Sequence, residues 1–271
     1  MKKVVITDLD DTLYSWLNFF VPAFYALVDE IVSITGLEKA VLLNEYKEKH
    51  QMYGSVEYPY TTLKLPSVLN KYKGLKEEEL KDALGEAFHK FNSIRKAKLE
   101  LFPNVFETLK KLTESGVKII GYTDSAEENG YYRLKRLDIE QFFHAVYVCK
   151  SEYICEYPSS LKIRQLSAKK PNKDVLYDIC RQEGVDLSDA VYVGDSLTKD
   201  MYMAHEAGIT SVWMQSPITD KALYDKLDEI SSWTDAETRQ NEALSRLWTE
   251  NNMQPDYEID DYSKIIDIVM K

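Results

Sequence analysis

The sequence is poor in cysteine and has fewer basic than acidic residues, and both features restrict what the protein can be. Three cysteines occur among 271 residues, Cys149, Cys155 and Cys180, and no pair has the CxxC spacing of a metal or redox site. This odd, scattered set argues against a disulfide framework or a zinc site and favours thiols in a reducing compartment. The net charge of −11 argues against a nucleic acid polymer or an anionic membrane as the main partner, because both require basic surfaces.

Long apolar runs are also scarce. We find no run that approaches the length of a membrane span, and Met1, Lys2 and Lys3 lead directly into an expected strand rather than into a signal-peptide core. The composition, 44% hydrophobic and 29% charged, is that of an ordinary soluble globular protein. We therefore expect a cytoplasmic protein of one large or two smaller domains, with no membrane partner.

The most informative stretch follows the first apolar run. Residues 4–7 are predominantly β-branched and predict a short buried strand. Asp8 and Asp10 come next, two residues apart, so extended backbone sends both side chains to the same side. Carboxylates this close need a cation, a network of hydrogen-bond donors or a raised pKa. The alternative is a polar strand end in which Asp11 or Thr12 caps a helix.

The next eighty residues favour helices and contain no convincing strand. Apolar side chains recur at three- and four-residue spacing in stretches that predict helices over 17–35, 38–52, 61–73 and 76–96. We interpret residues 16–98 as an all-helical insertion between the first strand and the first crossover helix.

Strands and helices alternate after residue 101. Strands are predicted over 117–123, 145–149, 190–193 and 210–213, and residues 150–168 are interpreted as a long loop. Alternation of this kind implies a parallel sheet with right-handed crossovers, which binds ligands beyond the carboxyl ends of its strands.

Polar residues follow several of these strands. They are Asp8 and Asp10 after the first, Thr123, Asp124 and Ser125 at the end of the second, and Asp195 after the fourth, with Lys169 and Lys170 before the intervening helix. The sequence therefore predicts that acidic, hydroxyl and ammonium groups gather at one edge of the sheet.

With these motifs the chain resembles the haloacid dehalogenase superfamily, whose members are mostly phosphatases. The matching residues are Asp8-Leu9-Asp10-Asp11-Thr12 for its DxDxT motif, Thr123 for its second motif, Lys170-Pro171 for its third, and Gly194-Asp195 with Asp200 for GDxxxxD. The resemblance covers about residues 1–15 and 99–215 and resumes at the expected closing strand, 255–260.

The resemblance implies a role for each matching residue. Asp8 would attack phosphorus and form an aspartyl-phosphate, and Asp10 would protonate the leaving alcohol and then activate water. The Thr123 hydroxyl and the Asp124 amide would hold the phosphoryl oxygens, and Lys170 would neutralise charge. Pro171 favours Lys170 over Lys169 for this role.

A counter-charge is required, because a carboxylate attacks an anionic phosphate. The resemblance implies a Mg²⁺ held by Asp8, the backbone carbonyl of Asp10 and Asp195. Asp200 would touch a metal-bound water or orient the lysine.

The expected fold is α/β: a Rossmann-like parallel sheet core with an inserted all-helical C1 cap. The core would comprise 1–15 and 99–271, and the cap 16–98. A helical insertion at 216–254 leaves the carboxyl edge of the sheet, so we expect it to shape the pocket or the surface of a possible homodimer. A surface helical pair is the alternative.

The expected function is hydrolysis of a small phosphate ester, a sugar phosphate or a nucleoside monophosphate, by a Mg²⁺-dependent phosphatase. By resemblance, Asp10 points to phosphoryl chemistry, because the superfamily's dehalogenases lack a carboxylate at that position. The alternatives are a phosphoglucomutase-like phosphotransferase, in which the cap excludes water, and a binding protein that has lost activity.

Overall fold

The computed structural model describes residues 2–150, 161–166, 168–215 and 220–271, and the chain divides into two compact units. The first unit contains a sheet and comprises Met1–Ser15, Glu100–Pro217 and Asn241–Lys271. The second is helical and comprises Trp16–Leu99 and Ile218–Gln240.

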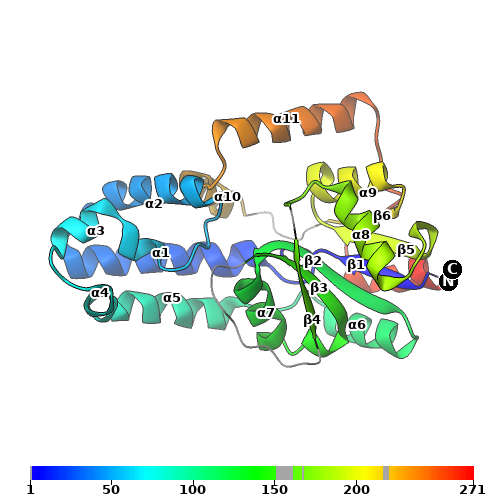
Figure 1. The fold of residues 1–271 in the computed structure, drawn as a ribbon, viewed down its shortest axis with the longest axis horizontal. Coiled ribbons are helices and arrows are strands. Elements are labelled where there is room, and N and C mark those ends of the chain that lie inside the picture. The colour runs from blue at the N-terminus through cyan, green and yellow to red at the C-terminus, as the bar shows by residue number, and fades with distance from the viewer. Residues whose placement is uncertain (1, 151–160, 167, 216–219) are drawn as a thin grey trace. The chain divides into compact units, whose positions relative to one another are not determined.

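The described residues of the sheet unit form seven parallel strands (Figure 1). They are β1 (Val4–Thr7), β2 (Lys118–Ala126), β3 (Phe143–Cys149), β4 (Lys162–Leu166), β5 (Ala190–Gly194), β6 (Thr210–Met214) and β7 (Tyr257–Ile259), in the spatial order β4-β3-β2-β1-β5-β6-β7. Strand β1 pairs with β2 on one side and with β5 on the other. The strand order therefore reverses beside β1, where parallel sheets bind ligands. The predicted fold class is confirmed.

Helices cover both faces of this sheet, which explains why its central strands are apolar throughout. Helices α8 (Lys173–Glu183) and α9 (Tyr202–Ala207) pack on the face that carries Val4 and Ile6. The opposite face meets helices α6 (Val105–Glu114) and α7 (Glu127–Arg136) and the C-terminal segment that ends in helix α12 (Ile265–Met270). On that face, the hydroxyl of Tyr262 donates a hydrogen bond of 3.1 Å to Thr7.

Strand β4 corrects one sequence-based expectation. Residues 150–168 were expected to form a long loop, but Lys162–Leu166 pairs in parallel with β3. This strand lies at the edge of the sheet and its residues are only partly buried, so it lacks the apolar run that marks a central strand. The remainder of the expected loop, at 151–160 and 167, lies outside the described residues.

The helical unit is organised around its longest helix. Its elements are α1 (Trp16–Thr35), α2 (Lys39–Tyr53), a 3₁₀ turn (Thr61–Lys64), α3 (Pro66–Lys71), α4 (Glu77–Ala83), α5 (Gly85–Lys98) and α10 (Lys221–Glu229). Helix α5 packs along α1, with Phe20 and Phe91 edge to face at 6.4 Å between ring centroids. The helix expected over 76–96 is broken at Leu84, and that over 61–73 begins as the 3₁₀ turn.

Helix α1 also corrects the statement that no run approaches a membrane span. By length and composition, helix α1 (Trp16–Thr35) is long and apolar enough to cross a membrane. However, 56% of its most apolar stretch is buried inside the protein, as in the core helix of a soluble protein. The helix looked shorter in the sequence because Asp29 and Glu30 interrupt its apolar residues.

Helix α10 comes from the second insertion, yet it belongs to the helical unit. The hydroxyl of Tyr25 donates to the Lys226 carbonyl at 2.9 Å and contacts Glu229 at 2.5 Å. His50 Nδ1 lies 2.8 Å from the Ile230 carbonyl. The expected division, which assigned all of 216–254 to the core, therefore differs from the observed one.

Helix α11 (Asp235–Glu250) begins in the helical unit and ends in the sheet unit. At its far end Trp248 is buried in the core beside the sheet, and Asn241 accepts a hydrogen bond of 2.7 Å from Thr198. The second insertion is thus divided between the two units, because its two ends bury their apolar side chains against different partners.

Candidate active site

The site residues approach one another because three neighbouring strands end at the same edge. Asp8 directly follows β1, Thr123 lies within β2, and Asp195 directly follows β5. The backbone amide of Asp8 donates to the Val193 carbonyl at 2.8 Å, which continues the pairing of β1 with β5 up to the site. The order β2-β1-β5 therefore brings Thr123 and Asp195 to the same edge as Asp8, which each follows by more than a hundred positions.

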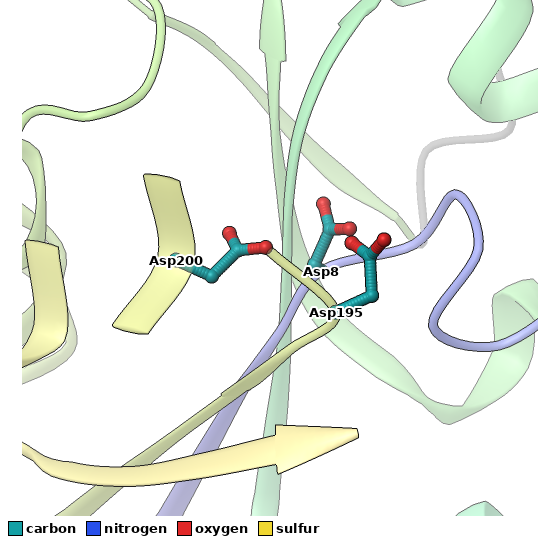
Figure 2. A group of neighbouring side chains, drawn as sticks. All are labelled: Asp8, Asp195 and Asp200. Atoms are coloured by element: carbon teal, nitrogen blue, oxygen red, sulfur yellow. The ribbon is translucent and has the colours of Figure 1, made fainter. Parts of the chain in front are cut away.

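Three carboxylates form a cluster at this edge. Asp8, Asp195 and Asp200 each offer an oxygen that lies within 4.8 Å of the other two. Figure 2 shows the carboxylates of Asp8 and Asp195 next to each other, with Asp200 approaching from the other side. Burial raises the pKa of Asp8 well above its usual range, and burial together with Asp200 and Asp11 raises the pKa of Asp195. The cluster therefore holds more negative charge than its surroundings neutralise.

Lys170 is the ammonium that enters this cluster. Its Nζ lies 2.5 Å from Asp8 Oδ1 and 2.8 Å from Asp200 Oδ1. Burial lowers the pKa of Lys170, but the carboxylates of Asp200 and Asp8 outweigh burial and raise it, so the side chain stays protonated. The neighbouring Lys169 is exposed, so the structure brings Lys170, rather than Lys169, into the site.

Asp200 is held in place by groups of its own unit. Its Oδ1 accepts hydrogen bonds from Lys170 and from the Tyr192 hydroxyl at 2.6 Å, and its Oδ2 accepts from the Ser196 amide at 3.1 Å. Its carboxylate also lies against Gly194, where an added Cβ would meet Asp200 Cγ at 2.5 Å. The first residue of the GDxxxxD motif is therefore a glycine because the last residue packs over it.

The donor set fits a hard divalent cation. Carboxylate oxygens are the ligands that such cations prefer, and the unneutralised charge on Asp8 and Asp195 is what a cation would offset. Both oxygens of Asp200 already accept hydrogen bonds, so this residue is better suited to holding Lys170 than to direct coordination.

Asp10 lies outside that cluster, in a network of hydrogen-bond donors. Its Oδ2 accepts from Thr123 Oγ1 at 3.2 Å and from Ser125 Oγ at 2.7 Å. Its Oδ1 accepts from Arg133 Nη1 at 2.7 Å. The two carboxylates after β1 therefore have different partners. Asp8 binds an ammonium, and Asp10 accepts hydrogen bonds from a guanidinium and two hydroxyls.

Asp124 contributes its side chain as well as its amide. Its Oδ1 accepts from the backbone amide of Lys170 at 3.0 Å, which ties the segment before α8 to the end of β2. The helix-cap alternative for Asp11 and Thr12 does not hold, because the next helix begins at Trp16 and Thr12 Oγ1 instead donates to Asp8 at 3.2 Å.

Sequence reasoning missed two residues of the site, Tyr192 and Arg133, and it noted Ser125 at a strand end without giving it a role. Ser125 follows the second motif directly, and Tyr192 precedes Gly194 by two positions, so motif spacing could have indicated both. Arg133 stands eight residues after Ser125 on a helix rich in charge, where an arginine normally faces solvent. No local pattern reveals its burial.

Comparison with known proteins identifies the family. A family model described as haloacid dehalogenase-like hydrolase matches residues 5–214. The chain belongs to this family. The matched range contains every residue of the site described above, which confirms the resemblance on which the sequence motifs were interpreted.

Two curated relatives of this family member are phosphatases. The glyceraldehyde 3-phosphate phosphatase of Methanopyrus kandleri is 27% identical over 272 residues, which cover 99% of this chain and 97% of the relative. Phosphoglycolate phosphatase 1 of Pseudomonas aeruginosa is 25% identical over 209 residues, which cover 77% of this chain and 68% of the relative.

Solved structures of other haloacid dehalogenase-like proteins share the fold. A 2-haloacid dehalogenase from Pseudomonas syringae pv. Tomato DC3000 superposes with a TM-score of 0.60 at 22% identity and covers 100% of this chain and 99% of its own. A phosphatase of the family from Thermococcus onnurineus superposes with a TM-score of 0.59 at 20% identity, with coverages of 98% and 97%.

Proposed function

We propose that the protein is a Mg²⁺-dependent phosphatase of small phosphorylated metabolites that works through an aspartyl-phosphate at Asp8. The coarser conclusion, that the chain is an enzyme hydrolysing phosphomonoesters, follows from its family and from its curated relatives, which are phosphatases. The cation, the covalent intermediate and the substrate class are our proposal.

One observation carries the proposal: Asp8 is a buried carboxylate that lies 2.5 Å from the Lys170 ammonium and beside the acidic side chain of Asp195. A carboxylate in this position can attack phosphorus only if the charge on the phosphate is offset. Lys170 supplies one positive charge. A Mg²⁺ held by Asp8, Asp195 and the backbone carbonyl of Asp10 would supply the rest by neutralising the phosphoryl oxygens.

In the proposed reaction, an oxygen of Asp8 bonds to phosphorus while the bond from phosphorus to the ester oxygen breaks. Asp10 gives a proton to the leaving alcohol. Water then attacks the phosphorus of the aspartyl-phosphate, Asp10 takes the proton of that water, and inorganic phosphate leaves as Asp8 is regenerated. The Thr123 hydroxyl and the Asp124 amide would hold the phosphoryl oxygens, with Thr123 giving up its hydrogen bond to Asp10.

The substrates of the relatives and the presence of the helical unit support the proposed substrate class. The relatives act on glyceraldehyde 3-phosphate and phosphoglycolate, so we place short phosphorylated carbon chains first, ahead of larger sugar phosphates and nucleoside monophosphates. We propose that the helical unit is the cap that selects among them, as a lid admits small esters and excludes bulky ones. A cytoplasmic location is proposed from the low cysteine content and from the free thiols of Cys149 and Cys180.

The proposal is tested by phosphate release from purified protein with a panel of these esters, with Mg²⁺ and with a chelator. We expect turnover of one or more small esters, loss of turnover with the chelator, and loss in Asp8→Asn but not in Asp186→Asn, an exposed control. Transfer between sugar hydroxyls without phosphate release would instead identify a mutase. An absence of turnover with every ester would identify a binding protein.

A further inference from the structure

Arg133 carries a buried positive charge, and it belongs to none of the four sequence motifs. It lies near the end of α7, its side chain is only 2% exposed, and it is among the largest fully buried side chains of the chain. A guanidinium is always protonated in proteins, and burying it without a partner is costly. The side chains that bind the Arg133 guanidinium therefore indicate its role.

The contacts of Arg133 converge on Asp10. Arg133 Nη1 donates to Asp10 Oδ1 at 2.7 Å and to Ser125 Oγ at 2.8 Å. Ser125 Oγ in turn donates to Asp10 Oδ2 at 2.7 Å. The three side chains form a closed triangle that fixes both oxygens of the carboxylate, and such a triangle restricts rotation more than a single bond does. The Asp10 side chain remains 22% exposed, so it stays accessible from outside the triangle.

The guanidinium also comes from a firmly packed element. Where α7 meets the sheet, a Cβ added to Gly130 would lie 3.4 Å from Val148 and 3.5 Å from Thr123, so the helix backbone comes close to β2 and β3 there. A residue one turn further along this helix is held by the same packing. The position of the Asp10 carboxylate is therefore fixed from a helix rather than from a loop, which is what an exact proton transfer requires.

We propose that Arg133 is a positioning residue for Asp10: with Ser125 it holds the Asp10 carboxylate in the orientation from which it exchanges protons with the leaving alcohol and with water. In this proposal Arg133 acts on Asp10 and is assigned no direct contact with the substrate or the phosphoryl group. This role rests on the proposed function, since it acts only through Asp10.

The first test is a double-mutant cycle in kcat/KM with an alkyl phosphate that the wild-type protein hydrolyses. Asp10→Asn should lower kcat/KM by about 10²- to 10⁴-fold, the usual contribution of a general acid. Arg133→Met should lower it by about 10²-fold, because a misplaced acid loses most of its effect. The double variant should be no slower than Asp10→Asn. Losses that multiply would overturn the proposal.

The second test separates positioning from a structural role. Nitrophenolate leaves without a proton, so Arg133→Met should lower kcat/KM for p-nitrophenyl phosphate by less than about threefold while the alkyl ester loses about 10²-fold. A merely structural role would lower both equally, and that result would contradict the proposal. Since kcat/KM reports the steps up to release of the alcohol, the later attack of water does not enter the comparison.

Two further variants act as controls. Arg133→Lys keeps a positive charge without the planar guanidinium and should recover only part of the loss with the alkyl ester, whereas Arg136→Met, at an exposed position of the same helix, should match the wild type. Urea unfolding of the single and double variants gives a readout without activity, in which Arg133 and Asp10 should show non-additive shifts of the midpoint.

If Arg133→Met does not fold, Ser125→Ala replaces it, because it removes one corner of the triangle and leaves both charges. It should show the same selective loss with the alkyl ester, on a smaller scale, and an equal loss with both esters would overturn the proposal. A wild-type protein that releases no phosphate from any ester overturns the proposed function itself. Normal wild-type turnover with unselective variants overturns only the role of Arg133.

Discussion

Lys170 and Asp200 form an ion pair of 2.8 Å in which both side chains are almost completely buried. A buried pair of this kind is weak evidence for stability by itself, because desolvation offsets much of the attraction. Its geometry is more informative: Asp200, itself held by Tyr192 and Ser196, directs the same ammonium to within 2.5 Å of Asp8. We infer that Asp200 serves the site chiefly by orienting the lysine.

Replacing Lys170 by methionine should lower kcat by about 10²- to 10³-fold, as for the loss of one donor to a developing charge. The physical reason is that no ammonium would then offset the charge on Asp8 and the phosphoryl group. Steady-state phosphate release measures the effect. Lys169→Met is the matched control, because Lys169 is adjacent and exposed, and it should retain wild-type turnover. Equal losses in both variants would count against the assignment of Lys170.

Gly194→Ala should impair both stability and turnover. Its Cβ would meet Asp200 Cγ at 2.5 Å and Oδ2 at 2.6 Å, so Asp200 must shift and carry Lys170 with it. Overpacking of this kind costs about 1–3 kcal/mol, which urea unfolding measures alongside kcat. Gly85→Ala is the control, because a Cβ there would have no neighbour within 4 Å among the described residues. A Gly194→Ala variant with full stability and turnover would show that Asp200 does not need its present position.

His50 should make the helical unit sensitive to acid. Burial lowers the pKa of His50 to about 4, against the opposing effect of its hydrogen bond to the Ile230 carbonyl. The unfolded chain takes up a proton near pH 6.5 and the folded chain only near pH 4, so this contribution to stability is complete above pH 6.5 and is lost as the pH falls toward 4. The loss amounts to about 3 kcal/mol at pH 4.

The measurement is the free energy of unfolding of the wild type and of His50→Gln between pH 4 and 7. The difference between the two curves should shrink as the pH falls, because the variant has no imidazole to protonate. Parallel curves would mean that His50 accepts a proton equally well in both states.

The sequence was sufficient to predict the central strands of the sheet and the site residues that follow them, and one physical reason explains both. Central strands buried on both faces are apolar throughout and end sharply at polar residues, so β1, β2 and β5 could be located together with the groups that follow them. Strand β4 was not predicted, because an edge strand with polar residues lacks the change from apolar to polar residues that marks the end of a central strand.

The remaining features depend on contacts between distant residues, which periodicity does not encode. Helix α10 joins the helical unit through Tyr25 and His50, about two hundred positions earlier in the chain. The buried charge of Arg133 is partnered by Asp10, 123 positions before it, which accepts its hydrogen bond. A charged residue on a charged helix is otherwise expected at the surface. The family's motifs identified the side chains at the strand ends. The residues that hydrogen-bond to those side chains could be identified only from the structure.

The most direct test of the account is to look for the covalent intermediate on Asp8. A reaction with substrate, quenched during turnover and reduced with borohydride, converts an aspartyl-phosphate to homoserine at the position that carried it, and peptide mass spectrometry locates that position. We predict homoserine at Asp8 in samples that received substrate, and none in wild-type samples prepared without substrate. Phosphate release with unmodified Asp8, or with the modification at another carboxylate, would contradict the central claim.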